Sequence, residues 1–414
     1  MARALELAAR GMDSTDPNPR VGCVIARDSQ IIGEGWHERA GEAHAEVAAL
    51  RSVSEGRAAG TGPGPPRAGK VDAKLGLSGV GEARGAGDAA GATVYVTLEP
   101  CSHYGRTPPC ANALIAARVA RVVFAVGDPN PKVSGGGAAA LRAAGIQVES
   151  GLMEAEAGEL NVGFIKRMRV GRPFVRLKLA MSLDGRTALA NGASQWITGE
   201  AARHDVQLWR ARSSVVMIGA GTLAADDPRL DVRLPGEKRR QPLRVVLDAR
   251  LRTSPDARLF TTGGKVLIFT AAAAGAAGVP VAAGVAGAPG VAGRAGDARA
   301  SSRAQLVDRG AQVEDIAATG NQLDLVAVLE RLAQLECNEV LLEAGAKLAG
   351  AFLRESLVDE LLIYMAPKLL GPQAMPLVEL PQLDILSAAP GFVIEDSVRV
   401  GEDLRLRLRP KKEG

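Results

Sequence analysis

Short apolar runs, each followed by a segment of helical periodicity, organise the first 150 residues. Strands are expected at residues 21–26, 30–35, 92–97 and 120–126, and helices at 44–50, 110–118 and 137–144. Strands that alternate with helices build layered α/β sheets. The pattern therefore predicts one α/β domain over residues 1–150.

The same alternation returns after residue 173. Strands are expected at residues 174–181, 215–218, 243–248, 265–270 and 340–343, and helices at 198–212 and 323–335. Thr198 is expected to cap the first of these helices through its hydroxyl. Residues 403–409 alternate Leu with Arg, which predicts a half-buried edge strand. A second α/β domain is therefore expected over residues 173–414.

Three segments interrupt these domains or join them. Residues 151–172 carry acidic and then basic side chains and predict a linker helix between the two domains. Residues 55–91 and 271–304 are rich in Gly, Ala and Pro, and they offer little apolar surface to offset the entropy of ordering. We expect both to be mobile surface insertions rather than domain boundaries.

Composition narrows the class of protein. The chain has 414 residues, of which 47% are hydrophobic and 23% charged, and this balance fits a folded globular protein. The net charge of +4 and the aromatic content of 3% speak against a nucleic-acid partner, and no apolar run is suited to a membrane. Only four cysteines are present, which favours a reducing, cytoplasmic location. We expect a small-molecule substrate and a homo-oligomer.

One imidazole and two thiols are spaced as in a catalytic zinc site. His44 opens a predicted helix, Cys110 opens another, and Cys101 follows a strand. Three protein ligands leave the fourth zinc position to water, and Glu46 could carry protons between that water and a leaving amine. The alternatives are a surface histidine with two core thiols, or a structural zinc with His103 as its fourth ligand.

Polar and small residues also collect at strand ends in the second domain. Residues 177–185 place Lys178, Ser182 and Asp184 at the end of a strand, while 219–228 and 343–350 are rich in small residues that let a backbone approach phosphate. None of these stretches has the full dinucleotide fingerprint. Asp184-Gly185 by itself is equally well explained as a tight turn.

The motifs that carry these residues resemble the bifunctional riboflavin-biosynthesis deaminase/reductase family. The relevant stretches are 17–22 (Pro-Asn-Pro-Arg-Val-Gly), 41–46 (Gly-Glu-Ala-His-Ala-Glu) and 97–110, in which eight residues separate the two cysteines. Residues 194–198, 225–228 and 340–345 are similar to the reductase half of that family.

The resemblance implies a cytidine-deaminase-like three-layer α/β/α domain and a dihydrofolate-reductase-like α/β domain. It also implies zinc-dependent deamination of 2,5-diamino-6-(5-phosphoribosylamino)pyrimidin-4-one, followed by reduction of its ribose by NADPH. Zn²⁺ and NADPH are therefore the expected cofactors.

Further residue roles follow from the resemblance alone. Asn18 is expected to contact the pyrimidine, and His103 and Arg106 to approach the substrate and its phosphate. Lys178 is expected to polarise the oxygen or imine at the reacting ribose carbon. The residues expected around NADPH are Ala180, Trp196, Thr222, Asp226, Ala344, Gly345, Ala346, Lys347, Leu348, Ala349 and Gly350. Those expected to hold the reductase substrate are Ser194, Arg210, Leu230, Arg233 and Glu343.

Several of these residues also have an explanation that involves no ligand. Arg106 is as well explained as a turn residue, and Lys178 as a strand-end lysine that reaches solvent. The family often has Gly where this chain has Ala180. Cys23 and Cys337 are expected in the core, His204 in solvent, and His37 near the zinc site.

Two other functions are compatible with a zinc site of this kind. A nucleic-acid base deaminase needs aromatic stacking platforms, and this chain has few aromatic residues. A zinc-stabilised nucleotide sensor needs no proton shuttle at Glu46.

Overall fold

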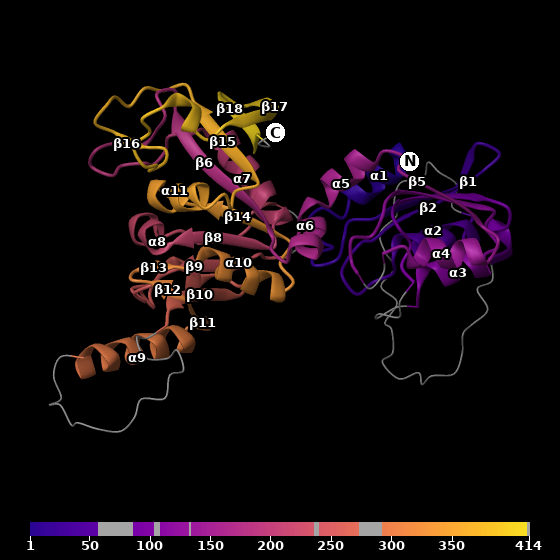
Figure 1. The fold of residues 1–414 in the computed structure, drawn as a ribbon, viewed down its shortest axis with the longest axis horizontal. Coiled ribbons are helices and arrows are strands. Elements are labelled where there is room, and N and C mark those ends of the chain that lie inside the picture. Colours follow the sequence, from indigo (N-terminus) through magenta and orange to yellow (C-terminus); the bar gives the residue numbers. More distant parts are fainter. Residues whose placement is uncertain (57–85, 103–107, 132–133, 236–239, 273–291, 412–414) are drawn as a thin grey trace. The chain divides into compact units, whose positions relative to one another are not determined.

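The computed structural model describes residues 1–56, 86–102, 108–131, 134–235, 240–272 and 292–411. Its contacts divide the chain into two units, Met1–Val170 and Gly171–Gly414, and each is described by itself below (Figure 1).

A five-stranded sheet forms the centre of the first unit, in the order β2-β1-β3-β4-β5. β1 is antiparallel to both β2 and β3, whereas β3, β4 and β5 are parallel. The strands are β1 (Gly22–Arg27), β2 (Gln30–Trp36), β3 (Thr93–Leu98), β4 (Arg121–Val126) and β5 (Gln147–Ser150). The helices are α1 (Ala2–Ala9), α2 (Ala45–Ser54), α3 (Cys110–Ala116), α4 (Gly136–Ala143), α5 (Glu154–Leu160) and α6 (Val162–Val170).

Helices cover both faces of this sheet. The face that presents Cys23 and Ile25 packs against α2, α3 and α4, and the opposite face packs against α1, α5 and α6. Alternation along β1 explains the division, because neighbouring side chains of a strand point to opposite faces. The first unit is thus a three-layer α/β/α fold, as the sequence predicts.

The expected linker helix is wrong in one respect, because residues 151–172 form two helices, α5 and α6. Asn161 lies between them and is buried, and its side chain bonds the backbone of Arg20, with Arg20 N to Oδ1 at 2.8 Å and Nδ2 to Arg20 O at 2.9 Å. These two hydrogen bonds satisfy the buried side-chain amide of Asn161, and the helix is interrupted at this residue. It also ties the segment to the first unit.

The C-terminal end of the segment expected to be a first insertion, residues 86–91, is packed against the first unit. A 3-10 helix, η1, spans Ala86–Ala89, and the Ala89 side chain is fully buried. The Arg27 guanidinium donates to the backbone carbonyls of Asp88 and Ala90. Residues 57–85 lie outside the described residues.

The second unit is built on a nine-stranded sheet, in the order β11-β10-β9-β8-β14-β6-β15-β18-β17. The seven strands from β11 to β15 are parallel, and β18 and β17 complete the sheet in antiparallel pairing. The strands are β6 (Phe174–Ser182), β8 (Val215–Gly219), β9 (Leu243–Leu247), β10 (Val266–Ala271), β11 (Ala311–Ile316), β14 (Glu339–Glu343), β15 (Glu360–Ala366), β17 (Phe392–Val400) and β18 (Asp403–Pro410).

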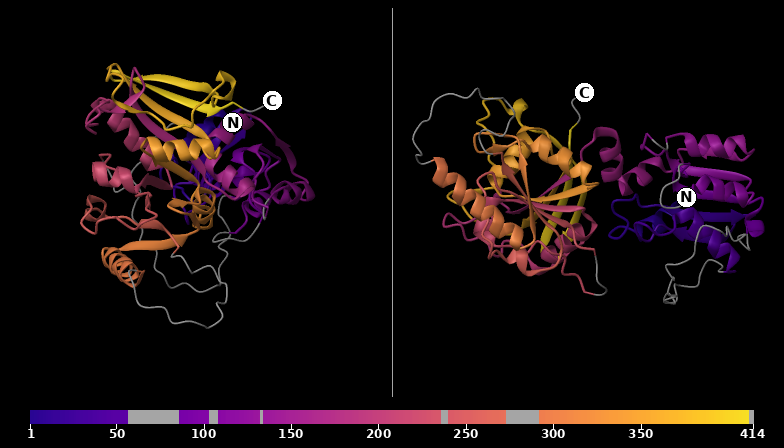
Figure 2. Two further views of the ribbon diagram at one scale, coloured as in Figure 1. Left: turned by 60° about the vertical axis from the view of Figure 1, so that its left-hand side comes forward. Right: turned by 90° about the horizontal axis from the view of Figure 1, so that it is seen from below.

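Helices lie on both faces of this second sheet as well (Figure 2). They are α7 (Glu200–Arg212), α8 (Ala220–Asp226), α9 (Ala292–Asp308), α10 (Leu325–Gln334) and α11 (Ala346–Arg354). Short pairs of strands, β7 (Arg186–Ala188) with β16 (Met375–Pro376) and β12 (Ala318–Thr319) with β13 (Gln322–Leu323), lie outside the main sheet. Short 3-10 helices occur at η2 (Arg258–Thr261) and η3 (Leu386–Ala388).

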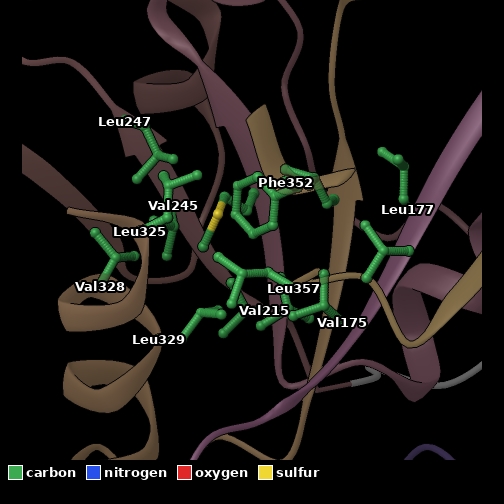
Figure 3. Packing of buried hydrophobic residues seen from close by; sticks show 14 of the residues in the cluster. Val175, Leu177, Val215, Val245, Leu247, Leu325, Val328, Leu329, Phe352 and Leu357 are labelled. Carbon is green, nitrogen blue, oxygen red and sulfur yellow. The ribbon is translucent and has the colours of Figure 1, made fainter. Parts of the chain in front are cut away.

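Figure 3 shows the largest of the three hydrophobic clusters that the described residues of the second unit form. Phe352 of α11 and Val328 of α10 pack there against Val215 of β8 and Val175 of β6, and all four side chains are fully buried. Burying an aromatic or aliphatic side chain of this size contributes about 1.5 to 3 kcal/mol. This core holds together the parallel strands β6, β8 and β14, whose carboxyl ends carry polar residues.

The expected cap at Thr198 is wrong. α7 begins at Glu200, its N-cap is Gly199, and no side chain of the N-cap bonds to the helix. The Gly199 N–H instead donates to Asp403 Oδ2 at 2.7 Å. A carboxylate distant in sequence therefore replaces the predicted hydroxyl.

The C-terminal strand is not an edge, contrary to expectation. β18 lies between β15 and β17, and β17 is the edge strand. Leu406 and Leu408 pack on the core of one face, whereas Arg405 and Arg407 approach the Trp209 ring on the other. The Leu/Arg alternation thus reflects two different covered faces rather than one face open to water.

The second insertion also contains more structure than expected. α9 spans residues 292–308, and Leu306 near its end is fully buried. Arg303 of this helix donates to the Val313 carbonyl at 3.1 Å and pairs with Asp315 at 2.6 Å. Residues 273–291 lie outside the described residues. None of the described helices combines the length and hydropathy that crossing a bilayer requires.

Candidate active sites

His44, Cys101 and Cys110 converge in the first unit. Their ligand atoms all lie within 4.8 Å of one another, with His44 Nδ1 at 3.2 Å from Cys110 Sγ and 3.6 Å from Cys101 Sγ. Among the described residues, this group contains no fourth Cys, His, Asp or Glu. One nitrogen and two sulfurs form the donor set of an open zinc site, so these residues fit the metal.

Local structure explains why the three side chains meet. His44 is the N-cap of α2 and Cys110 is the first residue of α3, and the Ala111 N–H bonds the Cys101 carbonyl at 3.1 Å. The Cys110 N–H also points at Cys101 Sγ, at 3.3 Å. Free N–H groups at the start of a helix favour thiolate sulfur.

The two thiols differ in protonation. The hydrogen bond with Cys110 lowers the pKa of the Cys101 thiol to about 4, with help from His44. The same hydrogen bond, together with burial, raises the pKa of Cys110. A divalent metal would bind both sulfurs as thiolates and release their protons.

Glu46 lies beside this cluster in the first turn of α2. It is 3% exposed, and burial raises the pKa of its carboxyl group above the ordinary value. The carboxyl group also hydrogen-bonds the Cys110 side chain. A buried carboxyl group next to a metal site is placed to take up and release a proton.

Asn18 and His37 adjoin the metal cluster. Nδ1 of His37 lies 3.0 Å from the Ala43 carbonyl, so this nitrogen carries a proton, and Nε2 lies 3.0 Å from Asn18 Nδ2. The His37 ring also meets the His44 ring edge-on, with centroids 5.5 Å apart. The expected approach of His37 to the zinc site is confirmed.

Glu99 is a structural residue of this site that the sequence analysis did not single out. Its buried carboxylate accepts N–H groups from Asp128 at 3.3 Å, Gly135 at 3.1 Å and Ala138 at 3.1 Å. At the same place, a Cβ on Gly137 would overlap the Pro100 carbonyl. Glu99 therefore holds the start of α4 against the segment that carries Cys101. The signal was available as a carboxylate directly before Pro100-Cys101.

The second unit gathers its polar residues where the strand order reverses. β8 and β14 are neighbours in the sheet. After β8 the chain continues to β9 on one side of this pair, whereas after β14 it passes β6 and continues to β15 on the other side. Such a switch point opens a crevice at the carboxyl ends of the two strands, and ligands of open α/β sheets bind there. β8 ends at Gly219 and β14 at Glu343, so both small-residue segments face this crevice.

Lys178, Arg210 and Glu343 meet at this edge. Lys178 and Glu343 are register partners on β6 and β14, and Arg210 forms a two-pronged ion pair with Glu343. Burial lowers the pKa of Lys178, with Glu343 acting against the shift, and Arg210 lowers the pKa of Glu343 against the effect of burial. Lys178 is thus half-buried, beside the charges of Glu343 and Arg210.

Other residues expected to bind the reductase ligands surround this group. Burial raises the pKa of Asp226, whereas a hydrogen bond with the Ser194 side chain and the charge of Lys178 act in the opposite direction. Arg233 pairs with Asp231, whose carbonyl accepts a bond from Arg210 at 3.2 Å. The structure therefore brings together most of the side chains that the resemblance assigned to the substrate.

The segment 344–350 forms the start of α11 and packs closely on its neighbours. A Cβ on Gly345 would lie 3.7 Å from Thr222 Oγ1, which places α8 and α11 side by side. A Cβ on Gly350 would overlap the Glu379 carbonyl, so only glycine fits there. Ala180 lies on β6 opposite Tyr364 of β15.

Two further expected site residues, Leu230 and Trp196, differ in exposure. Leu230 is 1% exposed within the core that contains Leu223. Trp196 is 63% exposed, with the Arg203 guanidinium 4.6 Å from its ring centroid. His103 and Arg106 lie outside the described residues. Cys23 and Cys337 are buried and His204 is exposed, as expected.

Two family models match the chain. "Cytidine and deoxycytidylate deaminase zinc-binding region" covers residues 1–126, and "RibD C-terminal domain" covers residues 173–404. The riboflavin biosynthesis protein RibD of Escherichia coli K12 is 43% identical over 99% of this chain and 98% of its own length. The chain belongs to the RibD family. Its relative in Haemophilus influenzae is 40% identical over 99% of this chain and 96% of its own length.

Solved structures agree over the whole chain. RibD of Acinetobacter baumannii superposes with a TM-score of 0.80 at 41% identity, and the match covers 99% of this chain and 98% of that one. A Thermotoga maritima protein, named a diaminohydroxyphosphoribosylaminopyrimidine deaminase/5-amino-6-(5-phosphoribosylamino)uracil reductase, superposes with a TM-score of 0.76 at 30% identity and covers 99% and 97%.

Family membership settles the class of protein. This chain is a bifunctional enzyme of riboflavin biosynthesis that joins a zinc-binding deaminase domain to a reductase domain. The predicted family, the cytidine-deaminase-like and dihydrofolate-reductase-like fold classes and the double activity are confirmed. The roles of individual residues stay predictions.

Proposed function

We propose that the first unit deaminates 2,5-diamino-6-(5-phosphoribosylamino)pyrimidin-4-one and that the second unit reduces the ribose of the product with NADPH. The observation that carries the first half is the meeting of His44, Cys101 and Cys110 beside the buried Glu46. The observation that carries the second half is the group formed by Lys178, Arg210 and Glu343 at the switch point of the sheet.

In the deaminase unit, zinc held by His44, Cys101 and Cys110 would supply the nucleophile, because it would lower the pKa of a bound water far enough for hydroxide to form at neutral pH. Glu46 moves two protons in turn: its carboxylate takes one from the attacking water and passes it to the ring nitrogen, and then takes the remaining proton of the added hydroxyl and passes it to the amine, which leaves as ammonia. Its raised pKa supports this exchange in both directions. Asn18 presents its Oδ1 to the pyrimidine, because its Nδ2 is held by His37.

In the reductase unit, NADPH supplies a hydride to the anomeric carbon of the ribose. Lys178 donates a hydrogen bond and then a proton to the oxygen that leaves that carbon, so that the opened ring becomes a ribityl chain. Because burial lowers the pKa of Lys178, its ammonium group gives up the proton more readily than a lysine in water. The family contacts proposed for NADPH lie on α8 and at the start of α11, with Thr222 next to Gly345.

Glu46→Gln tests the deaminase half. The variant should keep its zinc and its fold but lose deamination of the diaminopyrimidine by about 10²- to 10⁴-fold, which is the usual contribution of a positioned acid or base. Reduction of the already deaminated intermediate should be unchanged. Glu42→Gln, at an exposed position close by in sequence, is the matched control. Full deamination by the Glu46→Gln variant would exclude the proposed proton shuttle.

Removal of zinc by a chelator tests the metal. Deamination should disappear and should return when zinc is added, while NADPH oxidation on the deaminated intermediate continues. His44→Ala should reduce the zinc content, measured by atomic absorption, without affecting the reductase. A reductase that fails together with the deaminase would show that the two sites are not independent.

Several broader expectations belong to the same proposal. We propose that the chain works in the reducing cytoplasm as a homo-oligomer, and that it uses small-molecule substrates without a nucleic-acid partner. Exposed apolar side chains on the edge strand β17, Val393 and Ile394, support self-association. Light scattering tests it, and a wild-type chain that is monomeric at all accessible concentrations would contradict it.

A further inference from the structure

Side chains from elsewhere in the second unit hold the backbone of residues 229–233. This segment lies between α8 and β9 and belongs to no helix or strand. Two of its members, Leu230 and Arg233, are among the residues expected to hold the reductase substrate. The side chains that fix this backbone therefore bear on how the substrate is bound.

Gln241 holds the middle of the segment at Val232. Its Oε1 accepts the Val232 N–H at 2.8 Å, and its Nε2 donates to the Val232 carbonyl at 3.2 Å. A residue of an adjacent antiparallel strand would form the same pair of bonds with Val232. The Gln241 carboxamide thus takes the place of a neighbouring strand.

α7 holds the residues on either side of Val232 with two side chains that lie one turn apart. Gln207 Oε1 accepts the Arg233 N–H at 3.0 Å, and Arg210 Nη1 donates to the Asp231 carbonyl at 3.2 Å. Residues three apart lie on the same face of a helix, so one face of α7 reaches both positions. Gln207 is 9% exposed, and water therefore competes little for its bond to Arg233.

The chain turns just before these bonds. Leu230 has a φ of 60°, in the left-handed region that is unfavourable for a leucine. Its side chain is buried, whereas Arg229 and Arg233 are exposed. The bonds to the next three residues support this turn and determine the direction in which the Arg233 side chain leaves the backbone.

Arg233 lies close to the group at the switch point of the sheet. Its guanidinium pairs with Asp231, and its side chain is 49% exposed. Burial raises the pKa of Glu343, and the charge of Arg233 is among those that lower it, so this charge is felt at the end of β14. A guanidinium with five N–H groups keeps donors for a second anion beside Asp231. Arg233 is therefore suited to the phosphate of a ribose phosphate substrate.

We infer that Gln207 is a positioning residue of the reductase, because its bond to the Arg233 N–H sets the direction from which the Arg233 guanidinium meets the substrate phosphate. The inference rests on the proposed reductase function and deepens it by assigning Arg233 to the phosphate end of the substrate. The alternative is that Gln207 only stabilises the fold and has no effect on phosphate binding.

Steady-state kinetics of the full-length protein test the inference with 5-amino-6-(5-phosphoribosylamino)uracil as substrate and its phosphate-free counterpart as a competing ligand. Gln207→Leu should raise the KM for the substrate by about tenfold and change kcat by less than about twofold, since a binding contact is weakened and no step of the reaction is. The inhibition constant of the phosphate-free compound should not change. His204→Gln, at an exposed position of the same helix, is the matched control and should behave as the wild type.

A double-mutant cycle separates positioning from a structural role. Arg233→Gln should itself raise the KM by at least about tenfold. Gln207→Leu added to Arg233→Gln should raise it by less than about twofold further, because no guanidinium is then left to place. Gln207→Glu keeps an oxygen at the same reach and should return the KM to within about threefold of the wild type. Gln207→Asn is one methylene shorter, should behave like Gln207→Leu, and replaces it if that variant does not fold.

Three results would overturn the inference and leave the proposed reduction intact. They are an unchanged KM in Gln207→Leu, an effect of Gln207→Leu that is equally large with and without Arg233, and a fall in kcat and melting temperature at a constant KM. A wild type that does not oxidise NADPH on the deaminated substrate would overturn the proposed reductase function, and the inference with it.

Discussion

The Arg210 guanidinium donates two hydrogen bonds to the Glu343 carboxylate, from Nε to Oε1 at 2.6 Å and from Nη2 to Oε2 at 2.9 Å. A third N–H reaches the Asp231 carbonyl at 3.2 Å. Since a guanidinium has five N–H groups, two remain for a ligand. Both partners of this pair are largely shielded from solvent, so Arg210 supports Glu343 in addition to any contact with substrate.

Replacing Arg210 by Gln should therefore destabilise the second unit as well as impair reduction. It leaves Glu343 buried without its cation, which typically costs about 3 to 5 kcal/mol. Urea unfolding measures the loss, with Arg250→Gln on the surface as control. If the variant raises the KM for the reductase substrate without any loss of stability, the pair has no structural role.

A second buried ion cluster lies at the opposite end of the same strands. Arg176 is 1% exposed and pairs with Glu360 at 2.5 Å and with Glu339 at 3.0 Å, and Arg407 adds a bond to Glu360 at 2.8 Å. Glu360→Gln should lower the free energy of unfolding by about 3 to 5 kcal/mol, because the buried Arg176 guanidinium then loses one of its two carboxylate partners. Glu395→Gln, on the exposed edge strand β17, should change it by less than about 0.5 kcal/mol. Equal effects of both substitutions would contradict this assignment.

His37 is expected to act through Asn18. With its Nδ1 proton on the Ala43 carbonyl, His37 offers Nε2 as an acceptor, and this fixes Asn18 with its amide nitrogen inward and its oxygen outward. His37→Phe removes the acceptor and frees the carboxamide to rotate. We expect a several-fold rise in the KM for the diaminopyrimidine with zinc content unchanged, as loss of one hydrogen bond of about 1 kcal/mol implies.

His37→Gln is the informative companion, since its side-chain oxygen can replace Nε2 as acceptor and should restore part of the affinity. Loss of zinc from His37→Phe would instead show that the ring supports His44, against which it packs.

Asp184 gives the second unit a defined acid sensitivity. The hydroxyl of Ser182, with the N–H groups of Leu370 and Gly371, lowers the pKa of this carboxyl group from 3.8 to about 2. A depressed folded pKa stabilises the protein above pH 3.8, and the contribution fades as the pH falls toward 2. The melting temperature of Asp184→Asn should therefore lie below that of the wild type at pH 7, and the gap should narrow below pH 4. A gap that stays constant or widens with acid would rule out the carboxylate as its source.

Local chemistry was readable in the sequence. His44 and Cys110 lie at helix starts, a strand precedes Cys101 and another ends at Glu343, as predicted, because apolar periodicity and chain punctuation act over a few neighbouring residues. The family motifs added Asn18 and the reductase residues, and the structure gathers most of them at one edge of a sheet.

Only the tertiary structure shows the features that depend on contacts between residues distant in the chain. Asn161 splits the expected linker helix by bonding Arg20, Asp403 takes the place of Thr198 at the start of α7, and β17 turns the expected edge strand into an interior one. Each depends on a polar partner more than 140 residues away or on a neighbouring strand. Sequence patterns report the preference of a segment for helix or strand, whereas buried hydrogen bonds and strand order depend on which segments meet in space.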